Sequence, residues 1–214
     1  GLAEAEPYFD AILYAWHSGT CAAQSIVDII YGKVNPSGKL PISFPRVTGQ
    51  IPIYYNHPSM PRNGRAYYGE GSNYWDNQST PMYPFGYGLS YTQFEYYDIC
   101  CETDTLTLDK LQDGEKFKVS VTVTNTGDCD GKETVQCYIS DLVSSMVRPV
   151  RELKGFVKAS LKQGESTKII FEIGFNELGF YNADGKFCVE PGEFEVFIGG
   201  DCTTKNRIKI TVAA

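Results

Sequence analysis

The sequence predicts a mainly β protein, in which a two-sheet antiparallel β-sandwich follows an incomplete α/β segment and a long aromatic-rich connector. Three observations predict this order. A helical apolar pattern is confined to residues 1–47. Residues 48–98 contain many rings and prolines but little periodicity. Residues 99–214 repeat the alternation of apolar and polar residues that is typical of half-buried strands.

The composition supports a folded, acidic protein. Of 214 residues, 42% are hydrophobic and 21% are charged, which allows a packed core and argues against intrinsic disorder. Lysine and arginine total 19 and aspartate and glutamate total 26, so the net charge is 19 − 26 = −7. This charge argues against binding to nucleic acid or to an anionic membrane surface.

Residues 1–47 contain one helical pattern. The apolar residues that form one face of this helix are Ala22, Ala23, Ile26, Val27, Ile29 and Ile30. We expect Ser18 or Thr20 to cap its start and Gly32 to take the left-handed position just past its end. The face at Ile26, Ile29 and Ile30 is expected to be covered, since such a patch is rarely left bare.

A turn and an edge strand are expected after this helix. Residues 35–38, Asn-Pro-Ser-Gly, have the order typical of a β-turn. Residues 40–44 alternate, but prolines at 41 and 45 would restrict such a strand to the edge of a sheet. One helix and one or two short strands cannot bury each other's apolar faces, and fewer than about 50 residues seldom fold alone. We therefore predict that residues 1–47 are the tail of a larger α/β domain.

Residues 48–98 are predicted to be a connector packed between domains. They include thirteen Tyr, Phe and Trp residues, Trp75 among them, and prolines that interrupt regular strands. Large rings contribute mainly buried area, so packing is the favoured role. Rings can also stack on sugars, and whether connector residues such as Trp75 line an active site stays open.

Residues 99–214 are predicted to form the sandwich. The alternating apolar sets are Phe117, Val119, Val121 and Val123; Val135, Cys137 and Ile139; Ile169, Phe171 and Ile173; Phe194, Val196 and Ile198; and Ile208, Ile210 and Val212. Asp184-Gly185 predicts a tight hairpin, and Pro191-Gly192 predicts a turn. About seven short strands over this length are typical of an antiparallel sandwich.

Cysteine usage predicts a reducing compartment. The seven cysteines are irregularly spaced and contain no CxxC pair, which indicates neither a disulfide framework nor a zinc site. We therefore expect free thiols and a cytoplasmic rather than a secreted protein.

Three motifs, in this order, resemble the C-terminal end of glycoside hydrolase family 3. The first is similar to the end of that family's α/β sandwich domain: Ala15–Gly19 (AWHSG), Ala23–Gly32 (AQSIVDIIYG) and Asn35–Pro41 (NPSGKLP). The second, Tyr83–Phe94 (YPFGYGLSYTQF), is similar to the entry to the last domain. The third is similar to the fibronectin type III-like domain: Val121–Gly127, Gly131–Gln136, Glu152–Phe156 and Glu190–Gly192. His17 and Thr20 depart from the residues more usual after the tryptophan.

The resemblance implies a division of the chain. Residues 1–47 would end the α/β sandwich domain, residues 48–98 would connect, and residues 99–214 would form the fibronectin type III-like, immunoglobulin-like sandwich. Gly38 would support a turn, and Gly86 and Gly88 would allow close backbone approach.

The resemblance also implies that the catalytic pair lies elsewhere. Family members carry an aspartate nucleophile on a (β/α)₈ barrel and an acid/base glutamate early in the α/β sandwich domain, and neither segment is found in this sequence. Glu70, in Gly69-Glu70-Gly71, has a setting similar to that of the family's glutamate. It follows the NPSGKLP motif, whereas the family's glutamate precedes that motif, so we interpret Glu70 as a solvated loop residue. Asp76 is a weaker candidate.

No other constellation in the sequence indicates chemistry. His17 and His57 are isolated imidazoles, for which packing or surface roles are favoured. We expect no catalytic residue, no metal site and no cofactor in this chain, and we assign no substrate-binding residue.

The favoured interpretation is the structural C-terminal portion of a retaining β-glycosidase. The enzyme would be of the β-glucosidase type and would release sugars from the non-reducing ends of oligosaccharides. Its partners would be the upstream barrel and α/β sandwich domains, and its substrate would bind through them. The alternative is a non-catalytic sandwich module that binds carbohydrate or protein.

Overall fold

The computed structural model describes residues 2–58 and 77–214, and the described chain is mainly β, as predicted. Short 3₁₀ helices at Glu6–Tyr8 and Thr48–Gln50 flank α1 (Ala22–Ile30). Eight principal strands follow: β1 (Phe94–Cys101), β2 (Thr105–Thr107), β3 (Phe117–Asn125), β4 (Gly131–Asp141), β5 (Glu152–Leu161), β6 (Ser166–Ile173), β9 (Gly192–Gly199) and β10 (Arg207–Ala213). The short helices α2 (Leu108–Gln112) and α3 (Phe175–Leu178) and the hairpin strands β7 (Phe180–Tyr181) and β8 (Phe187–Cys188) complete the order.

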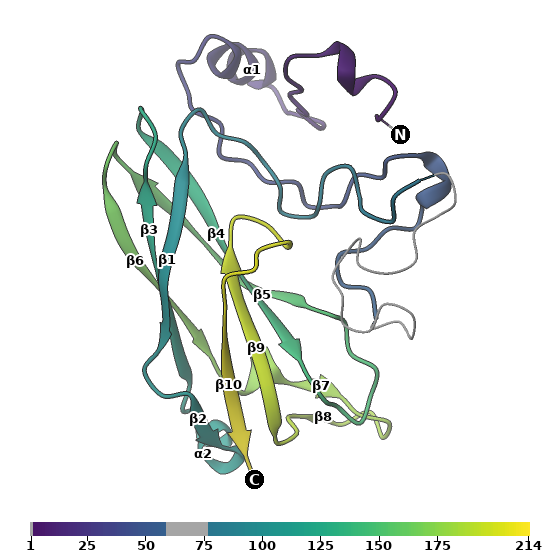
Figure 1. Ribbon diagram of the computed structural model, residues 1–214, viewed down its shortest axis with the longest axis vertical. Coiled ribbons are helices and arrows are strands. Elements are labelled where there is room, and N and C mark those ends of the chain that lie inside the picture. Colours follow the sequence, from purple (N-terminus) through teal and green to yellow (C-terminus); the bar gives the residue numbers. More distant parts are fainter. Residues whose placement is uncertain (1, 59–76) are drawn as a thin grey trace.

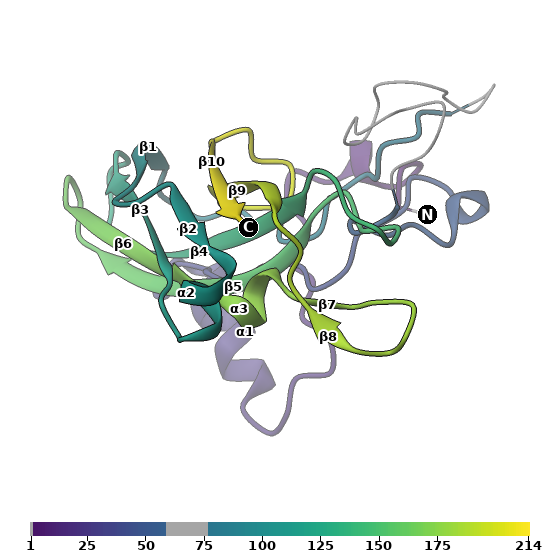
Figure 2. The ribbon, with the colours of Figure 1, turned by 90° about the horizontal axis from the view of Figure 1, so that it is seen from below.

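The strands form two facing sheets and a separate hairpin. One sheet has the order β1-β3-β6 and is antiparallel throughout. The other has the order β2-β10-β9-β4-β5, in which only β2 pairs in parallel, with β10. The β7–β8 hairpin projects from the sandwich in both views (Figures 1 and 2). The predicted Asp184-Gly185 turn closes this hairpin, with Gly185 at a φ of 72°.

The core follows from the alternation of the strands. In β3, Phe117, Val119, Val121 and Val123 are all fully buried. They belong to one apolar cluster with Val135, Cys137 and Ile139 of β4 and with side chains of β6, β9 and β10. The strand residues predicted from period-two alternation are therefore the ones that join the two sheets.

The first residues lie at the opposite end of the sandwich from α2 and the C-terminus (Figure 1). Figure 2, seen from below, places α2 in front and α1 behind the sandwich. No helix among the described residues is long and apolar enough to cross a membrane.

Helix α1 forms where it was predicted, but its cap and cover differ from expectation. Cys21 occupies the N-cap without a side-chain hydrogen bond, and the Ser18 hydroxyl instead donates to the Ala15 carbonyl at 2.6 Å. Gly32 takes the predicted left-handed conformation, with a φ of 69°. Ile30 is 63% exposed, while Ile26 and Ile29 are half-buried. The apolar face is thus not closed by the part of the chain that the structure describes.

The predicted turn at residues 35–38 is wrong, because the chain forms neither a turn nor a bend there. The Asn35 side chain, which would stabilise a turn locally, is used elsewhere: Oδ1 accepts from the Tyr91 backbone N–H at 2.9 Å, and Nδ2 donates to the Asp130 carbonyl at 3.0 Å. The expected edge strand is reduced to a single bridge between Phe44 and Tyr83.

Some of the described connector rings are packed, whereas Tyr54 and Tyr91 are 64% and 52% exposed. Tyr55 stacks on Phe85 with centroids 4.1 Å apart, and both rings contact a second small core of Tyr138, Phe197 and Cys202. This core lies on the outer side of the five-stranded sheet. Strand β4 is consequently buried without interruption from Glu133 to Asp141, because its inward side chains join the main core and its outward ones lie under the connector.

Candidate functional site

The motif segments meet along one contact, which we call the seam. It consists of residues 35–44, residues 82–92, strand β4 and the β9–β10 loop at residues 200–206. The first two segments run alongside each other through backbone hydrogen bonds: Leu40 N–H donates to Tyr87, Gly86 N–H to Leu40, and Phe44 N–H to Tyr83, each at 2.8 Å. Cys202 N–H donates to the Phe85 carbonyl at 3.1 Å, which adds the β9–β10 loop.

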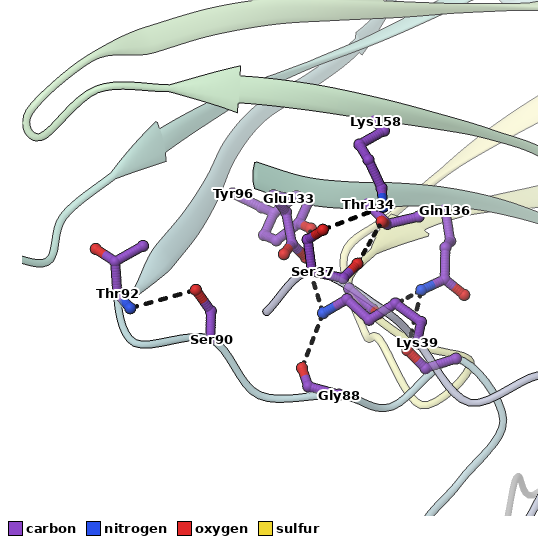
Figure 3. A network of polar contacts seen from close by, with 12 residues as sticks. Ser37, Lys39, Gly88, Ser90, Thr92, Tyr96, Glu133, Thr134, Gln136 and Lys158 are labelled. Atoms are coloured by element: carbon purple, nitrogen blue, oxygen red, sulfur yellow. Dashed lines mark hydrogen bonds and ion pairs between the residues drawn. The ribbon is translucent and has the colours of Figure 1, made fainter. Parts of the chain in front are cut away.

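One polar group at the seam is a nearly buried ion pair (Figure 3). Lys39 Nζ lies 3.4 Å from Glu133 Oε1, and the two side chains are 15% and 5% exposed. Lys39 Nζ also donates to the Gly88 carbonyl at 2.9 Å, and the Tyr96 hydroxyl donates to Glu133 Oε1 at 2.7 Å. Burial, together with the neighbouring Glu133 carboxylate, raises the pKa of Tyr96, which keeps this hydroxyl a donor.

A second polar group is centred on Gln136. Its Nε2 donates to the carbonyls of Gly86 and Gly200, and its Oε1 accepts from the Tyr138 hydroxyl at 2.6 Å. Gln136 thereby connects the connector and the β9–β10 loop to β4, with its side chain buried. Burial also raises the pKa of Tyr138.

A third polar group closes the seam at the Asn125-Thr126-Gly127 turn. Asn125 is fully buried, accepts from the Thr92 hydroxyl at 2.6 Å and donates to the carbonyls of Cys129 and Leu161. The neighbouring Ser37 links residues 35–44 to the sheet, since its carbonyl accepts from Thr134 and its hydroxyl from Lys158 (Figure 3).

The polar contacts of this site hold residues 35–44 and 82–92 against the sandwich, and they do not form a catalytic arrangement. The Glu133 carboxylate is engaged by a lysine and a tyrosine rather than facing a second carboxyl group, which retaining glycoside hydrolysis requires. Within residues 2–58 and 77–214, no group of three or more His, Cys, Asp or Glu side chains could hold a metal ion.

The sequence candidates are not brought together at the seam. Glu70, Trp75 and Asp76 lie outside the described residues. His17 is exposed beside Trp16, and a ring nitrogen of His57 lies 3.0 Å from the Pro58 carbonyl oxygen. The residues that organise the seam, Lys39, Glu133 and Gln136, stand inside the quoted motifs, but only their presence in a motif could have singled them out.

Two protein-family matches cover most of the chain. Residues 2–91 match the glycosyl hydrolase family 3 C-terminal domain, and residues 133–202 match the fibronectin type III-like domain. The seam is the contact between these two matched regions: residues 35–44 and 82–91 belong to the first, and most of β4 belongs to the second.

Relatives of known name are considerably longer than this chain. A periplasmic β-glucosidase of Salmonella typhimurium is 46% identical over 94% of the chain, which spans 26% of that protein. A putative β-xylosidase of Formosa agariphila is 43% identical over 89% of the chain, which spans 23% of that protein. The chain therefore spans about a quarter of the length of these relatives.

Solved structures agree in fold along the whole chain. The β-glucosidase of Listeria innocua in complex with glucose superimposes with a TM-score of 0.88 at 38% identity. The match covers 100% of this chain and 29% of the Listeria chain. The same enzyme carrying a D270A mutation, in complex with laminaribiose, superimposes with a TM-score of 0.87.

The prediction of a cytoplasmic location is contradicted by the Salmonella relative, whose name places it in the periplasm. The cysteine argument fails for a physical reason. All seven cysteines are free in the structure, and Cys137 and Cys202 are packed into the two cores. Burial protects these two thiols in any compartment, so they do not identify one; it does not account for Cys21, Cys100 and Cys129, which are exposed. With the family matches, the relatives and the fold in agreement, the chain belongs to glycosyl hydrolase family 3, as a C-terminal part that carries the fibronectin type III-like domain.

Proposed function

We propose that this chain is the structural C-terminal portion of a retaining β-glycosidase that hydrolyses non-reducing-end β-glycosidic bonds of oligosaccharides. Its specificity class is that of β-glucosidases, since the Salmonella and Listeria relatives carry that name. The chain itself contributes no nucleophile and no acid/base group. Its role is to attach the sandwich rigidly to the end of the α/β domain.

The observation that carries this proposal is the seam. Its buried polar groups connect two segments of the family 3 C-terminal domain to strand β4 of the fibronectin type III-like domain. Such dense, satisfied polar contacts fix one relative placement of two units. By contrast, the described part of the chain offers no pair of facing carboxyl groups at this contact.

The proposal divides the chain into three parts, with strand β1 (Phe94–Cys101) crossing the boundary between the second and the third. Residues 1–47 would complete the α/β sandwich domain of the whole enzyme, residues 48–98 would connect, and residues 99–214 would form the sandwich domain. The half-exposed face of α1, with Ile30 at 63%, supports this division because it would be buried by the remainder of that domain. The barrel and α/β sandwich domains would be the partners of this chain and would bind the substrate.

We further propose that the whole enzyme is exported, in line with the periplasmic relative. Fractionation of cells that produce the whole enzyme tests this directly. Activity in the periplasmic or culture fraction supports it, and activity confined to the cytoplasm contradicts it.

Hydrolysis of an aryl β-glucoside by two preparations tests the functional proposal. The 214-residue chain alone is expected to be inactive, and the whole enzyme that contains it is expected to turn the substrate over. A Glu70→Gln variant of both preparations is the control, and it should leave the activity of the whole enzyme in place. Turnover by the isolated chain that is lost in Glu70→Gln would overturn the assignment. Calorimetric binding of an oligosaccharide by the isolated chain would instead favour the non-catalytic binding module.

A further inference from the structure

One ion pair of the seam differs from the others in the described chain. Only two pairs there have both side chains no more than 15% exposed: Lys39–Glu133 and Arg148–Asp141. The second joins the end of β4 to the loop that follows it, within the sandwich. Lys39–Glu133 joins the sandwich to the segment after α1, so it is the buried ion pair that crosses the seam.

The position of Glu133 allows its carboxylate to contact two different parts of the chain. Side chains alternate along β4, so Glu133 shares the inward face with Val135 and Cys137 and points between the two sheets at the end of the sandwich. Tyr96, from β1 of the opposite sheet, donates to the same oxygen that faces Lys39. A single carboxylate oxygen therefore contacts both an element of the other sheet and residues 35–44.

The partner lysine is equally constrained. Lys39 Nζ donates to the Gly88 carbonyl of the connector while it contacts Glu133. Gly88 in turn lies against the Gly38 carbonyl so closely that a β-carbon at Gly88 would overlap it. A shift of either segment along the other would separate Lys39 from one partner or the other.

Buried ion pairs contribute little net stability, because desolvation offsets their attraction, but leaving one partner unpaired is costly. This asymmetry penalises arrangements of the seam that separate Lys39 from Glu133 while either side chain stays buried. We propose that Lys39, Glu133 and Tyr96 form a lock that fixes the register between residues 35–44, the connector and the sandwich, and that removing it frees this joint without unfolding the sandwich.

Hydrogen–deuterium exchange on the full 214-residue chain tests the proposal. The variants are Glu133→Gln, Lys39→Met and the double variant, and Glu172→Gln is the matched control. The control removes the carboxylate of the exposed Lys116–Glu172 pair, whose side chains are 47% and 53% exposed. In each single variant, exchange in peptides covering residues 35–46 and 82–92 should accelerate by about tenfold or more, while peptides of β3 keep wild-type rates. The double variant should recover part of the lost protection, since neither partner is left as an unpaired charge.

Two results would overturn the lock. If the single variants leave exchange at residues 35–46 and 82–92 unchanged, like Glu172→Gln, the pair does not fix the joint. If exchange in β3 accelerates as much as at the seam, the pair stabilises the fold as a whole. Neither result depends on whether the whole enzyme hydrolyses glycosides.

Discussion

The backbone of Gly88 lies directly against the carbonyl oxygen of Gly38, so that a β-carbon added to Gly88 would overlap this oxygen. The relationship is asymmetric, because a β-carbon added to Gly38 would meet no atom within 4 Å. The close approach of the two motif segments therefore depends on one glycine of the pair. The expectation that Gly38 supports a turn is wrong, since residues 35–40 form neither a turn nor a bend.

The glycine pair gives a matched prediction. Gly88→Ala should lower the free energy of unfolding by about 1–3 kcal/mol, because the overlapped atom belongs to the backbone and cannot rotate away. Gly38→Ala should leave stability nearly unchanged. Urea titration of both variants measures the difference, and equal stability of the two would contradict the asymmetry.

Removal of the buried Tyr138 hydroxyl should be costly. Tyr138→Phe leaves Gln136 Oε1 without the donor that lies 2.6 Å away, and an unpaired buried acceptor costs about 1–3 kcal/mol. Tyr181→Phe, at a ring that is 69% exposed, is the control and should change little. The midpoint of chemical denaturation measures both, and a neutral Tyr138→Phe would show that another donor replaces the hydroxyl.

The buried tyrosines predict a loss of stability in alkali. Burial raises the folded-state pKa of Tyr96 above the unfolded value of 10, so the unfolded chain releases this proton first. The stabilisation is complete below pH 10 and declines as the pH rises above that value. Each such group adds up to about 1.4 kcal/mol per pH unit to the slope.

Tyr96→Phe tests this slope. The variant should show a shallower decline of unfolding free energy above pH 10 than the wild type, by a difference that approaches about one proton near pH 11. A Tyr96→Phe slope that equals the wild-type slope would rule out Tyr96 as the group that titrates.

Thiol labelling should separate the cysteines by burial. Cys21, Cys100 and Cys129 are exposed and should react first with an aromatic disulfide reagent in the folded chain. Cys137 should react only after denaturation, because burial both hides its thiol and raises its pKa to about 12. Cys21→Ser should reduce the fast phase by one thiol. Fast labelling of Cys137 would mean that the core opens more readily than its packing indicates.

The sandwich was largely predictable because its strands carry local signals. Strands β3, β6, β9 and β10 coincide with the alternating residues that predicted them. Strand β5 carries no such alternation: it is an edge strand on which Phe156 is 65% exposed and Val157 37% exposed. Strand β1 begins at Phe94, inside the aromatic-rich segment that was assigned to the connector. Its rings were interpreted as packing residues, so its pairing with β3 was not predicted.

The seam could not be derived from the sequence because its contacts are distant along the chain. Glu133 pairs with a lysine 94 positions away, and Gln136 donates to a carbonyl 50 positions away. The failed turn at residues 35–38 has the same origin. Its local preference is overridden by Asn35 bonds to residues more than 50 positions distant. The resemblance located these residues in motifs but assigned none of their contacts.

The uninterrupted burial of β4 limits how this strand can vary. An ordinary strand of a sandwich alternates positions that accept substitution with positions that do not, as the burial pattern of β6 does. From Glu133 to Asp141 no outward position of that kind remains. Substitutions in this segment would require compensating changes both in the opposite sheet and in the connector. The sequence of the sandwich is therefore expected to change together with that of the domain before it.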